Sequence, residues 1–251
     1  MRVLVTFALE NEFAPWRKMR GFKRAVVDQW DHSYRKNFED ANVRVFLTGA
    51  GRFAAQRAAA IAFEEPADIC IAAGLSGGLR PEYLVGRVLT ARQVTKTDGF
   101  LLADPDLVSV AESVGAAVVQ RFLTSDEVVA SAEEKRKLGD LADAVDMESY
   151  WVLSAAASRG VPAVAIRSVS DTLDSDLPLD FNRIFNDRGA VSIPKVIGQL
   201  AARPSKVGGL VRLAHDSERA ASNLARVLDS FVQSVTLPPL RENAKAAALL
   251  V

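Results

Sequence analysis

The stretch "AVDMESYWVLSAAASRGVPAVAIRSVSD" (144–171) decides the fold class, because it joins an alanine-rich segment to a run of β-branched residues. Residues 147–160 predict a helix that ends at a glycine, and residues 162–170 predict a buried strand. A helix joined to a buried strand by so short a turn is typical of the βα units that build a mostly parallel sheet.

The same alternation of strand and helix extends outward from this stretch through most of the chain. Strands rich in β-branched residues are predicted at 2–9, 42–49, 68–74, 86–94 and 162–170. Covering helices are predicted at 52–65, 105–115 and 147–160. No repeat of fixed period and no low-complexity tract interrupts the pattern. We therefore expect one α/β domain over residues 1–203.

A C-terminal helical extension with a tail is expected over residues 204–251. It carries apolar side chains at helical spacing, which predict a long amphipathic helix or helix pair: Leu210, Leu213, Leu224, Val227, Leu228 and Phe231. The final residues, "TLPPLRENAKAAALLV" (236–251), predict a turn and a loosely held tail. We favour docking of the helix on its own domain or on a sister subunit. With Arg212, Arg219 and Arg226 nearby, peripheral contact with a membrane surface is the alternative.

Composition excludes several classes of protein. Lys plus Arg and Asp plus Glu both number 31, so no overall basic field attracts a nucleic acid. One cysteine excludes an intramolecular disulfide, and His32 and His215 lie too far apart in sequence for a zinc site. The N-terminal segment reaches Glu10 and Glu12 too early for a secretory signal, and no apolar run approaches about 18 residues. We therefore expect a cytoplasmic protein.

Polar or glycine-rich residues follow four of the predicted strands. They are "LENEF" (9–13), "GAGR" (49–52), "GLSGG" (74–78) and "SDTLD" (170–174). In open α/β sheets, ligands bind beyond the carboxyl ends of the strands. We therefore expect these segments to converge on one rim and to form a binding site there.

Each candidate segment also has a purely structural explanation. The helix dipole stabilises an acid such as Glu148 in a first turn, and Asp146 is suited to cap the same helix. The glycines of 74–78 fit a tight turn as well as a close approach of ligand to backbone amides. The segment "GAGR" is either an anion seat that uses Arg52 or a solvated first turn. Neither segment has the Walker or the Gly-x-Gly-x-x-Gly pattern, so nucleotide cofactors are not supported.

The whole set of motifs resembles one known superfamily. In this order and at these separations, "ALENEF", "TGAGRFAA", "GLSGGL", "VDMESY" and "IRSVSDTLD" are similar to the nucleoside phosphorylases and methylthioadenosine/S-adenosylhomocysteine nucleosidases over about residues 1–200. The most specific motifs are the Met-Glu pair that opens a helix and the Ser-Asp pair after a late strand. The resemblance implies a three-layer α/β sandwich with a central mixed, twisted sheet, and an enzyme that uses no cofactor or metal.

The resemblance also implies roles for individual residues. Glu148 matches the acid that accepts hydrogen bonds from the ribose hydroxyls, and Met147 matches the methionine that packs against the sugar. A carboxylate suits this role because an ionised carboxylate is purely an acceptor. Asp171 matches the residue that gives a proton or a strong hydrogen bond to purine N7, and Ser170 would orient Asp171. The leaving adenine needs this help because it departs with developing negative charge.

The nucleophile is predicted from the charges at the strand ends. Glu12 matches the acid that holds and deprotonates the attacking water, which hydrolysis needs and phosphorolysis does not. In a phosphorylase, phosphate would instead lie near Gly49, Arg52 and Ser76, with the amides of "GLSGG", including Gly77, as further donors. The family's small residue after the first glycine is here Leu75, with the serine shifted by one position. The sequence therefore favours water, with phosphate as the alternative.

The C-terminal half has a narrower resemblance. Its "VDMES", its Leu-Pro after the Ser-Asp loop and its later Asp-Ser helix resemble the hopanoid-associated branch, implicated in removing adenine from adenosylhopane. We therefore expect hydrolysis of a purine nucleoside, with adenine the favoured base and an apolar 5′ substituent, by a homo-oligomer, most simply a dimer. A non-catalytic nucleoside-binding protein is the alternative from another class, although binding alone does not need Glu12 and Asp171 together.

Overall fold

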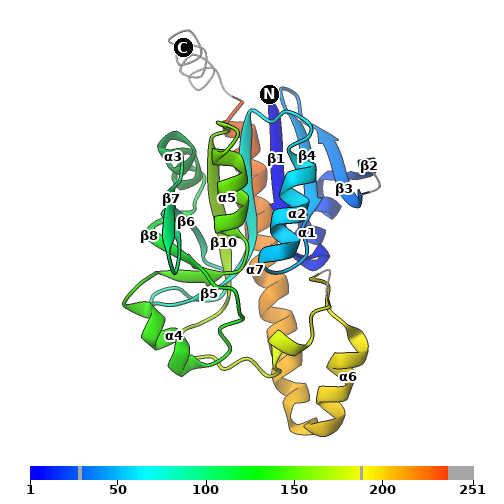
Figure 1. The fold of residues 1–251 in the computed structure, drawn as a ribbon, viewed down its shortest axis with the longest axis vertical. Helices are drawn as coiled ribbons and strands as arrows, with labels where there is room; N and C mark the ends of the chain where they lie inside the picture. The colour runs from blue at the N-terminus through cyan, green and yellow to red at the C-terminus, as the bar shows by residue number, and fades with distance from the viewer. Residues whose placement is uncertain (28–29, 187–188, 237–251) are drawn as a thin grey trace.

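The computed structural model describes residues 1–27, 30–186 and 189–236 (Figure 1). In these residues ten strands form one mixed sheet: β1 (Arg2–Phe7), β2 (Lys23–Val27), β3 (Trp30–Asn37), β4 (Asn42–Leu47), β5 (Ile69–Gly78), β6 (Val88–Lys96), β7 (Gly99–Leu102), β8 (Ala117–Thr124), β9 (Ala144–Asp146) and β10 (Ala163–Asp171). The predicted α/β fold with a central mixed sheet is confirmed.

The sheet is partly closed on itself. Its order is β10-β6-β8-β9-β5-β1-β4-β3-β2, with β7 paired to β6. Because β10 also pairs with β5, the strands β10, β6, β8, β9 and β5 form a closed ring. The strands β4, β1, β5 and β10 run parallel to one another. Their carboxyl ends therefore meet at one edge of the sheet, where ligands bind in folds of this kind.

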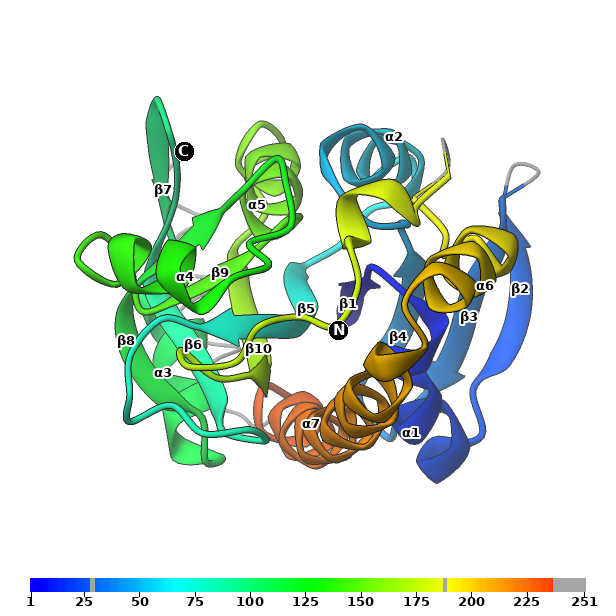
Figure 2. The same cartoon turned by 90° about the horizontal axis from the view of Figure 1, so that it is seen from below.

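Helices cover both faces of the sheet. The described residues form α1 (Glu10–Arg20), α2 (Arg52–Ala62), α3 (Pro105–Ser113), α4 (Ala132–Gly139), α5 (Ser149–Ala157), α6 (Ile193–Ala202) and α7 (Val207–Ser234), with 3-10 turns at Phe181–Arg183 and Pro204–Lys206. Figure 2 shows α2 and α5 on one face and α1 and α7 on the other. This arrangement gives three layers. Within the described residues, no helix has both the length and the apolar character needed to cross a bilayer.

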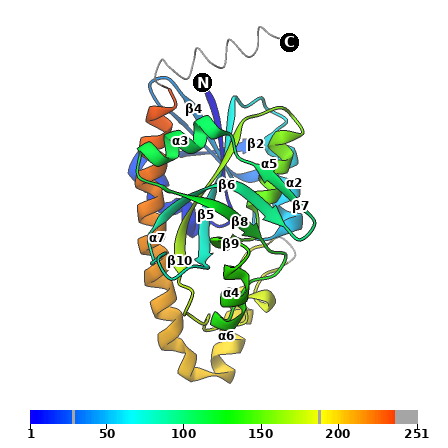
Figure 3. The ribbon, with the colours of Figure 1, turned by 90° about the vertical axis from the view of Figure 1, so that its left-hand side faces the viewer.

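The long predicted C-terminal helix is a single helix, α7, that runs along the sheet (Figure 3). In its second half, Leu224, Leu228 and Phe231 are buried in the same core as strand β1 and helix α1. Asp229 accepts a hydrogen bond from Trp16 Nε1 at 3.2 Å and pairs with Arg20. The hydrophobic core therefore does not divide near residue 203. The predicted tail beyond residue 236 lies outside the described residues.

The glycine-rich segment "GLSGG" is part of a strand and not the tight turn that is one interpretation of it. Strand β5 continues to Gly78, because Gly77 and Gly78 pair with Val145 and Ala144 of β9. On the other side of β5, Asp171 of β10 pairs with Gly77, after a β-bulge between Val169 and Asp171. The extension of β5 brings the glycine backbone alongside the predicted catalytic acid.

Candidate active site

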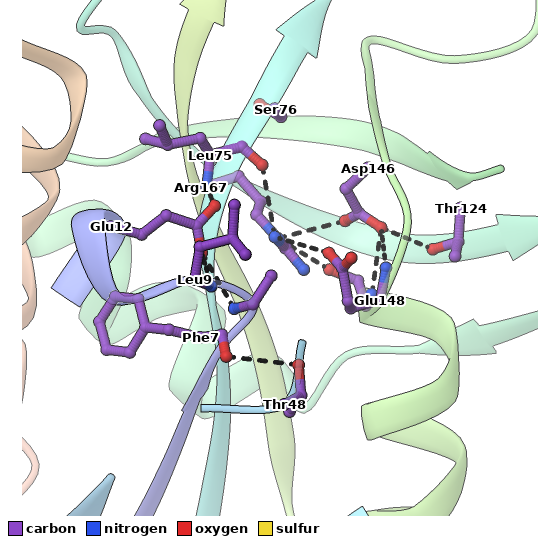
Figure 4. A network of polar contacts seen from close by, with 12 residues as sticks. Phe7, Leu9, Glu12, Thr48, Leu75, Ser76, Thr124, Asp146, Glu148 and Arg167 are labelled. Carbon is purple, nitrogen blue, oxygen red and sulfur yellow. Dashed lines mark hydrogen bonds and ion pairs between the residues drawn. The ribbon is translucent and has the colours of Figure 1, made fainter. Parts of the chain in front are cut away.

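An inner cavity of about 160 Å³ lies at the carboxyl ends of β1, β5, β9 and β10. All but one of the predicted site residues line it, and these are Glu12, Ser76, Gly77, Met147, Glu148, Ser170 and Asp171. They come from segments far apart in the sequence, and Figure 4 shows Glu12 and Glu148 on opposite sides of Arg167. The structure therefore brings together the strand ends that the sequence predicts to converge.

Glu12 lies in the first turn of α1, and its buried carboxylate accepts three backbone N–H groups. Oε2 accepts from Ala8 at 2.9 Å and from Leu9 at 3.0 Å, and Oε1 accepts from Leu75 at 3.1 Å. A carboxylate offers about four lone-pair sites, so one remains for a water molecule. Burial raises the pKa of Glu12 although Arg167 opposes the shift. Glu12 is therefore a stronger base than an exposed glutamate.

Glu148 does not cap its own helix, whereas Asp146 does. Asp146 Oδ1 accepts from the N–H groups of Glu148 and Ser149, both at 3.1 Å. The Glu148 side chain makes no capping bond, and its Oε1 instead accepts from the N–H of Gly51 at 2.8 Å. The capping explanation therefore holds for Asp146, whereas the Glu148 carboxylate makes its contact outside its own helix. Glu148 is buried and lines the inner cavity.

A buried arginine that sequence analysis did not single out connects the acids. Arg167 of β10 is 1% exposed, with Nε 3.2 Å from Asp146 Oδ2 and Nη1 3.5 Å from Glu148 Oε2. It also donates to Ser149 Oγ at 3.0 Å and to the Leu75 carbonyl at 3.3 Å. Figure 4 shows the guanidinium between the acids. A charged residue inside the predicted apolar strand 162–170 was the signal for it, since a buried arginine requires acidic partners.

The acids around Arg167 outnumber it. Glu12, Asp146 and Glu148 all interact electrostatically with this one guanidinium. Burial raises the pKa of Glu148 to about 7, Arg167 opposes the shift, and the charges of Asp146 and Glu12 add to it. Glu148 therefore exchanges a proton near neutral pH, which is common for acids at functional sites.

Gly74 shows why the segment 74–78 begins with glycine. A Cβ at this position, where φ is +156°, would lie 2.5 Å from Arg167 Nη1 and 3.3 Å from both carboxylate oxygens of Glu12. Side chains therefore occupy the space that a larger residue would need. The glycine permits close packing of the acid and the arginine, and it does not make a turn.

Asp171 has a cation of its own. The buried ammonium of Lys135, on α4, pairs with Asp171 Oδ2 and donates to the carbonyls of Thr172 at 3.1 Å and Ser175 at 2.8 Å. Ser170 Oγ donates to Asp171 Oδ1 at 2.8 Å, which is the contact that the predicted orienting role requires. Sequence analysis missed Lys135, because it lies in the charged run "EEKRK", which is typical of a solvated helix face.

Two more predicted residues face the same space. The hydroxyl of Ser76 is buried and has no hydrogen-bond partner within the described part of the chain. Because Ser76 lines the inner cavity, a ligand or water there can satisfy its hydroxyl. Met147 also lines the cavity and lies beside Gly51. It supplies an apolar surface next to the Glu148 carboxylate.

The predicted anion seat at 49–52 is not open to phosphate. The N–H groups of Gly49, Ala50 and Gly51 donate to Ala8 O, Gly189 O and Glu148 Oε1. Arg52 is exposed, lines neither the inner nor the outer cavity, and places its guanidinium 4.6 Å from the ring centre of Trp151. The three backbone N–H groups are therefore already hydrogen-bonded within the protein, and the Arg52 guanidinium lies against Trp151 and not in the cavity. This corrects the placement of Arg52 in the site.

Comparison with known proteins agrees with this geometry. A family model described as the phosphorylase superfamily matches residues 4–199. The chain belongs to the phosphorylase superfamily. Futalosine hydrolase from Streptomyces coelicolor is 32% identical over 130 residues, which cover 42% of this chain and 54% of that protein. The chain thus spans about half the length of the curated relative it matches.

Solved structures of the superfamily share the fold. A futalosine hydrolase mutant of Helicobacter pylori superimposes with a TM-score of 0.72 at 16% identity, over 93% of this chain and 99% of that one. The 5′-methylthioadenosine/S-adenosylhomocysteine nucleosidase of Neisseria meningitidis, in complex with methylthio-immucillin-A, gives 0.71 at 23% identity over 93% and 99%. Coverage of 93% of the 251 residues is about 233 residues, which is more than the 203 residues before Pro204. These matches therefore include part of α7. The shared fold therefore extends beyond the domain boundary expected at residue 203.

A larger outer cavity adjoins the inner one in this phosphorylase-superfamily chain. It has a volume of about 1140 Å³ and shares Glu12, Ser170 and Asp171 with the inner cavity. Its walls come from α1, α7 and the segment between β10 and α6, and are mainly apolar: Ala14, Pro15, Met19, Phe181, Val191, Leu210 and Leu213. An apolar group attached to a ligand in the inner cavity therefore has room to extend outward.

Proposed function

We propose that this member of the phosphorylase superfamily hydrolyses the N-glycosidic bond of a purine nucleoside, with adenine the favoured base. The observation that carries the proposal is the placement of Glu12, Glu148 and Asp171 on the lining of one cavity. A binding protein needs neither a base for water nor a donor to the leaving group. Two relatives are named as a hydrolase and a nucleosidase, which supports this class of reaction.

In the proposed mechanism, Glu148 holds the ribose and Glu12 holds water. Glu148 accepts from Gly51 and lies near Arg167, and its remaining lone pairs accept from the ribose hydroxyls. The free lone pair of Glu12 accepts a proton from water that attacks the anomeric carbon. Because Arg167 interacts with both acids, it fixes their relative positions. Arg167 is thus a positioning residue for the sugar and for the nucleophile.

Asp171 assists departure of the base. Ser170 and Lys135 hold its carboxyl group from two sides. For this role the Asp171 carboxylate takes up a proton from solvent when the nucleoside binds. Donation of that proton to purine N7 neutralises the charge that develops as the glycosidic bond breaks, and the sugar passes through an oxocarbenium-like state. The nearby ammonium of Lys135 adds electrostatic stabilisation of the same developing charge.

Water is favoured over phosphate as the nucleophile. A phosphate dianion in the inner cavity would meet the buried carboxylates of Glu12 and Glu148, which already share one guanidinium. The amides of 49–51 are engaged and Arg52 points away, so no further cation from that loop offsets the repulsion. Like-charge repulsion at intermediate dielectric is worth several kcal/mol, on the order of 4 kcal/mol at 4 Å. Water meets no such repulsion.

The outer cavity favours an apolar 5′ substituent. Its walls continue outward from the inner cavity and carry mainly apolar side chains. Resemblance to the hopanoid-associated branch makes adenosylhopane one compound to test, and the Streptomyces coelicolor relative makes futalosine another. A role of this protein in hopanoid biosynthesis is part of this proposal.

The nucleophile is tested by incubating the protein with adenine nucleosides in phosphate-free buffer. We expect release of free base and free ribose, with loss of turnover in Glu12→Gln. Glu10→Gln is the matched control, because Glu10 lies on the same helix but pairs with Arg17 and lines neither cavity. Strict dependence on added phosphate, with ribose 1-phosphate as the product, would replace hydrolysis by phosphorolysis.

The 5′ specificity is tested with a series of 5′-alkylthioadenosines in detergent-free buffer. Each buried methylene is expected to raise kcat/KM roughly fourfold until the cavity is filled. Leu213→Ser should reduce this gain for long chains and leave the methyl compound unaffected. Val211→Ser is the control, since Val211 is half exposed on the same helix and lies outside the cavity lining. A gain that is independent of chain length would remove the outer cavity from the proposed substrate site.

A further inference from the structure

The connection between α6 and α7 presents apolar side chains to solvent. Ile193 and Ile197 on α6 are 63% and 60% exposed, and Val207 and Val211 on α7 are 47% and 52% exposed. Each pair is four residues apart and thus shares a face of its helix. No residue of α6 is buried. Figures 1 and 3 show α6 and the start of α7 projecting beyond the sheet, and we call residues 191–212 the α6–α7 tip.

The α6–α7 tip is also strongly basic. Residues 190–215 contain Lys195, Arg203, Lys206 and Arg212 and no Asp or Glu, whereas the whole chain has a formal net charge of zero. All four basic residues are exposed. The basic charge is therefore concentrated where the apolar side chains are exposed. Exposed apolar side chains flanked by Lys and Arg are typical of helices that lie at the surface of an anionic membrane.

Charge argues against a second copy of the chain as the occupant of this surface. In a two-fold dimer the same patch lies on both sides of the contact. The four basic residues of one copy would then face those of the other, with no acid in 190–215 to pair with them. Lysine is also depleted at protein interfaces. An anionic lipid surface complements both the charge and the apolar pairs.

We propose that the α6–α7 tip docks on the surface of a bilayer that contains anionic lipids. The apolar pairs of α6 and α7 enter the boundary between headgroups and acyl chains, and the basic side chains contact lipid phosphates. The helices lie at the surface and do not cross it, because none of those in the described residues is long and apolar enough to span a bilayer.

Docking would place the outer cavity beside the bilayer. Val191, Leu210 and Leu213 line that cavity and come from the tip or its first α7 turns. If the proposed function holds, on which this step rests, a nucleoside whose apolar 5′ substituent lies in the bilayer enters the outer cavity directly. Membrane binding itself is measured without any substrate, so failure of docking and failure of catalysis are distinguishable.

The experiment is co-sedimentation of the purified full chain with vesicles. Vesicles of phosphatidylcholine alone are compared with vesicles that also contain phosphatidylglycerol, at low and at high salt. We expect binding only to the anionic vesicles, with weaker binding at high salt. Each basic residue near the surface is expected to contribute roughly fivefold to the partition coefficient.

Two double variants separate the apolar and the basic contributions. Ile193→Ser with Ile197→Ser should lower binding to anionic vesicles by at least about tenfold, because it removes two inserted side chains. Lys206→Glu with Arg212→Glu should abolish the salt-sensitive part of binding. The matched controls are Leu84→Ser with Leu141→Ser, which are 65% and 57% exposed, and Lys23→Glu with Arg92→Glu, which are exposed elsewhere on the sheet.

Three outcomes overturn the proposal. They are no binding of the parent protein to anionic vesicles, equal loss in the control variants, and unchanged binding in both tip variants. Light scattering after size exclusion measures the oligomeric state as a fourth test. If the parent protein is a dimer and the Ile193/Ile197 double variant is a monomer, a second copy of the chain covers the tip and the proposal is overturned. Circular dichroism of each variant shows whether it is folded, so that lost binding is assigned to the surface.

Discussion

The two sides of the inner cavity treat their acids differently. On the ribose side, Glu12, Glu148 and Asp146 share the single guanidinium of Arg167. On the purine side, Asp171 has Lys135 to itself. The two sides differ in the number of cations for each carboxylate and also in burial, because Glu12, Asp146 and Glu148 are buried whereas Asp171 is partly exposed.

This difference explains how one cavity can hold both a base for water, Glu12, and a residue that assists the leaving purine, Asp171. Burial raises the pKa values of Glu12 and Glu148 on the ribose side, and the charges of Asp146 and Glu12 add to the shift of Glu148, so both are stronger acceptors of protons than exposed glutamates. A matched ion pair on the purine side fixes the orientation of Asp171. The nucleophile side is therefore tuned for basicity and the leaving-group side for position.

The largest effect is expected from the purine side, in Asp171→Asn. The amide keeps the size of the side chain but cannot share a proton with N7, so turnover should fall about a hundredfold to ten-thousandfold. Asp174→Asn is the control, because Asp174 is exposed and pairs with Arg136. Steady-state rates of base release measure the effect, and wild-type turnover in Asp171→Asn would show that this side does not assist departure.

A smaller loss is expected in Lys135→Met, which removes the cation of the purine side. Misplacement of Asp171 should lower kcat roughly tenfold to a hundredfold, with little change in KM. Lys137→Met is the matched control, because Lys137 lies on the same helix and pairs with exposed Glu133. A change confined to thermal stability, with kcat intact, would make Lys135 structural and end the contrast between the two sides.

The ribose side is tested through the pH dependence of stability. The folded pKa of Glu148, about 7, lies above the ordinary value of 4.5, so folding is favoured by protonation and this group lowers stability as pH rises from about 4.5 to about 7. Glu148→Gln removes this dependence. Relative to the parent protein, its stability should increase over that range by up to about 3 kcal/mol. Thermal melts at several pH values measure it, and parallel curves for the two proteins would contradict the raised pKa.

The smallest effect is expected in Arg52→Ala. Because Arg52 stacks on Trp151 and lies outside both cavities, kcat/KM should change less than about twofold. The measurement is made with and without phosphate. A large loss seen only in the presence of phosphate would mean that Arg52 serves the nucleophile after all.

The sequence predicted what periodicity and strand ends can show. Strands β1, β4, β5, β6 and β10 were predicted, because buried parallel strands are continuous apolar runs. The resemblance to a known superfamily singled out Glu12, Glu148 and Asp171, and the structure places all three on the lining of one cavity. Strand β3, "WDHSYRKN", was missed because its polar composition hides a strand, and only its pairing with β4 reveals it. Helix α4 was missed because its charged run "EEKRK" is typical of a solvent-exposed surface.

The cations of the site were harder to predict than its acids. Arg167 and Lys135 are both almost fully buried. Lys135 looks ordinary in its charged local sequence, and the only local signal for Arg167 is its position inside a predicted apolar strand. Their partners lie 36 residues away for Lys135 and 19 to 21 residues away for Arg167, on other elements. The local sequence therefore identifies the titratable side chains, whereas the three-dimensional fold determines which oppositely charged partner each of them has.

The contact between α1 and α7 sets an order of events during synthesis of the protein. Trp16 bonds to Asp229, which is 213 residues later in the chain. At about 5 to 20 residues per second, a ribosome needs on the order of ten to forty seconds to make that intervening length. Throughout this interval the aromatic cluster around Phe13, Trp16 and Phe22 lacks the helix that covers it. The nascent chain therefore lacks the α7 cover of its N-terminal aromatics until the segment around Asp229 has been made, and holding chaperones can act on that segment in the meantime.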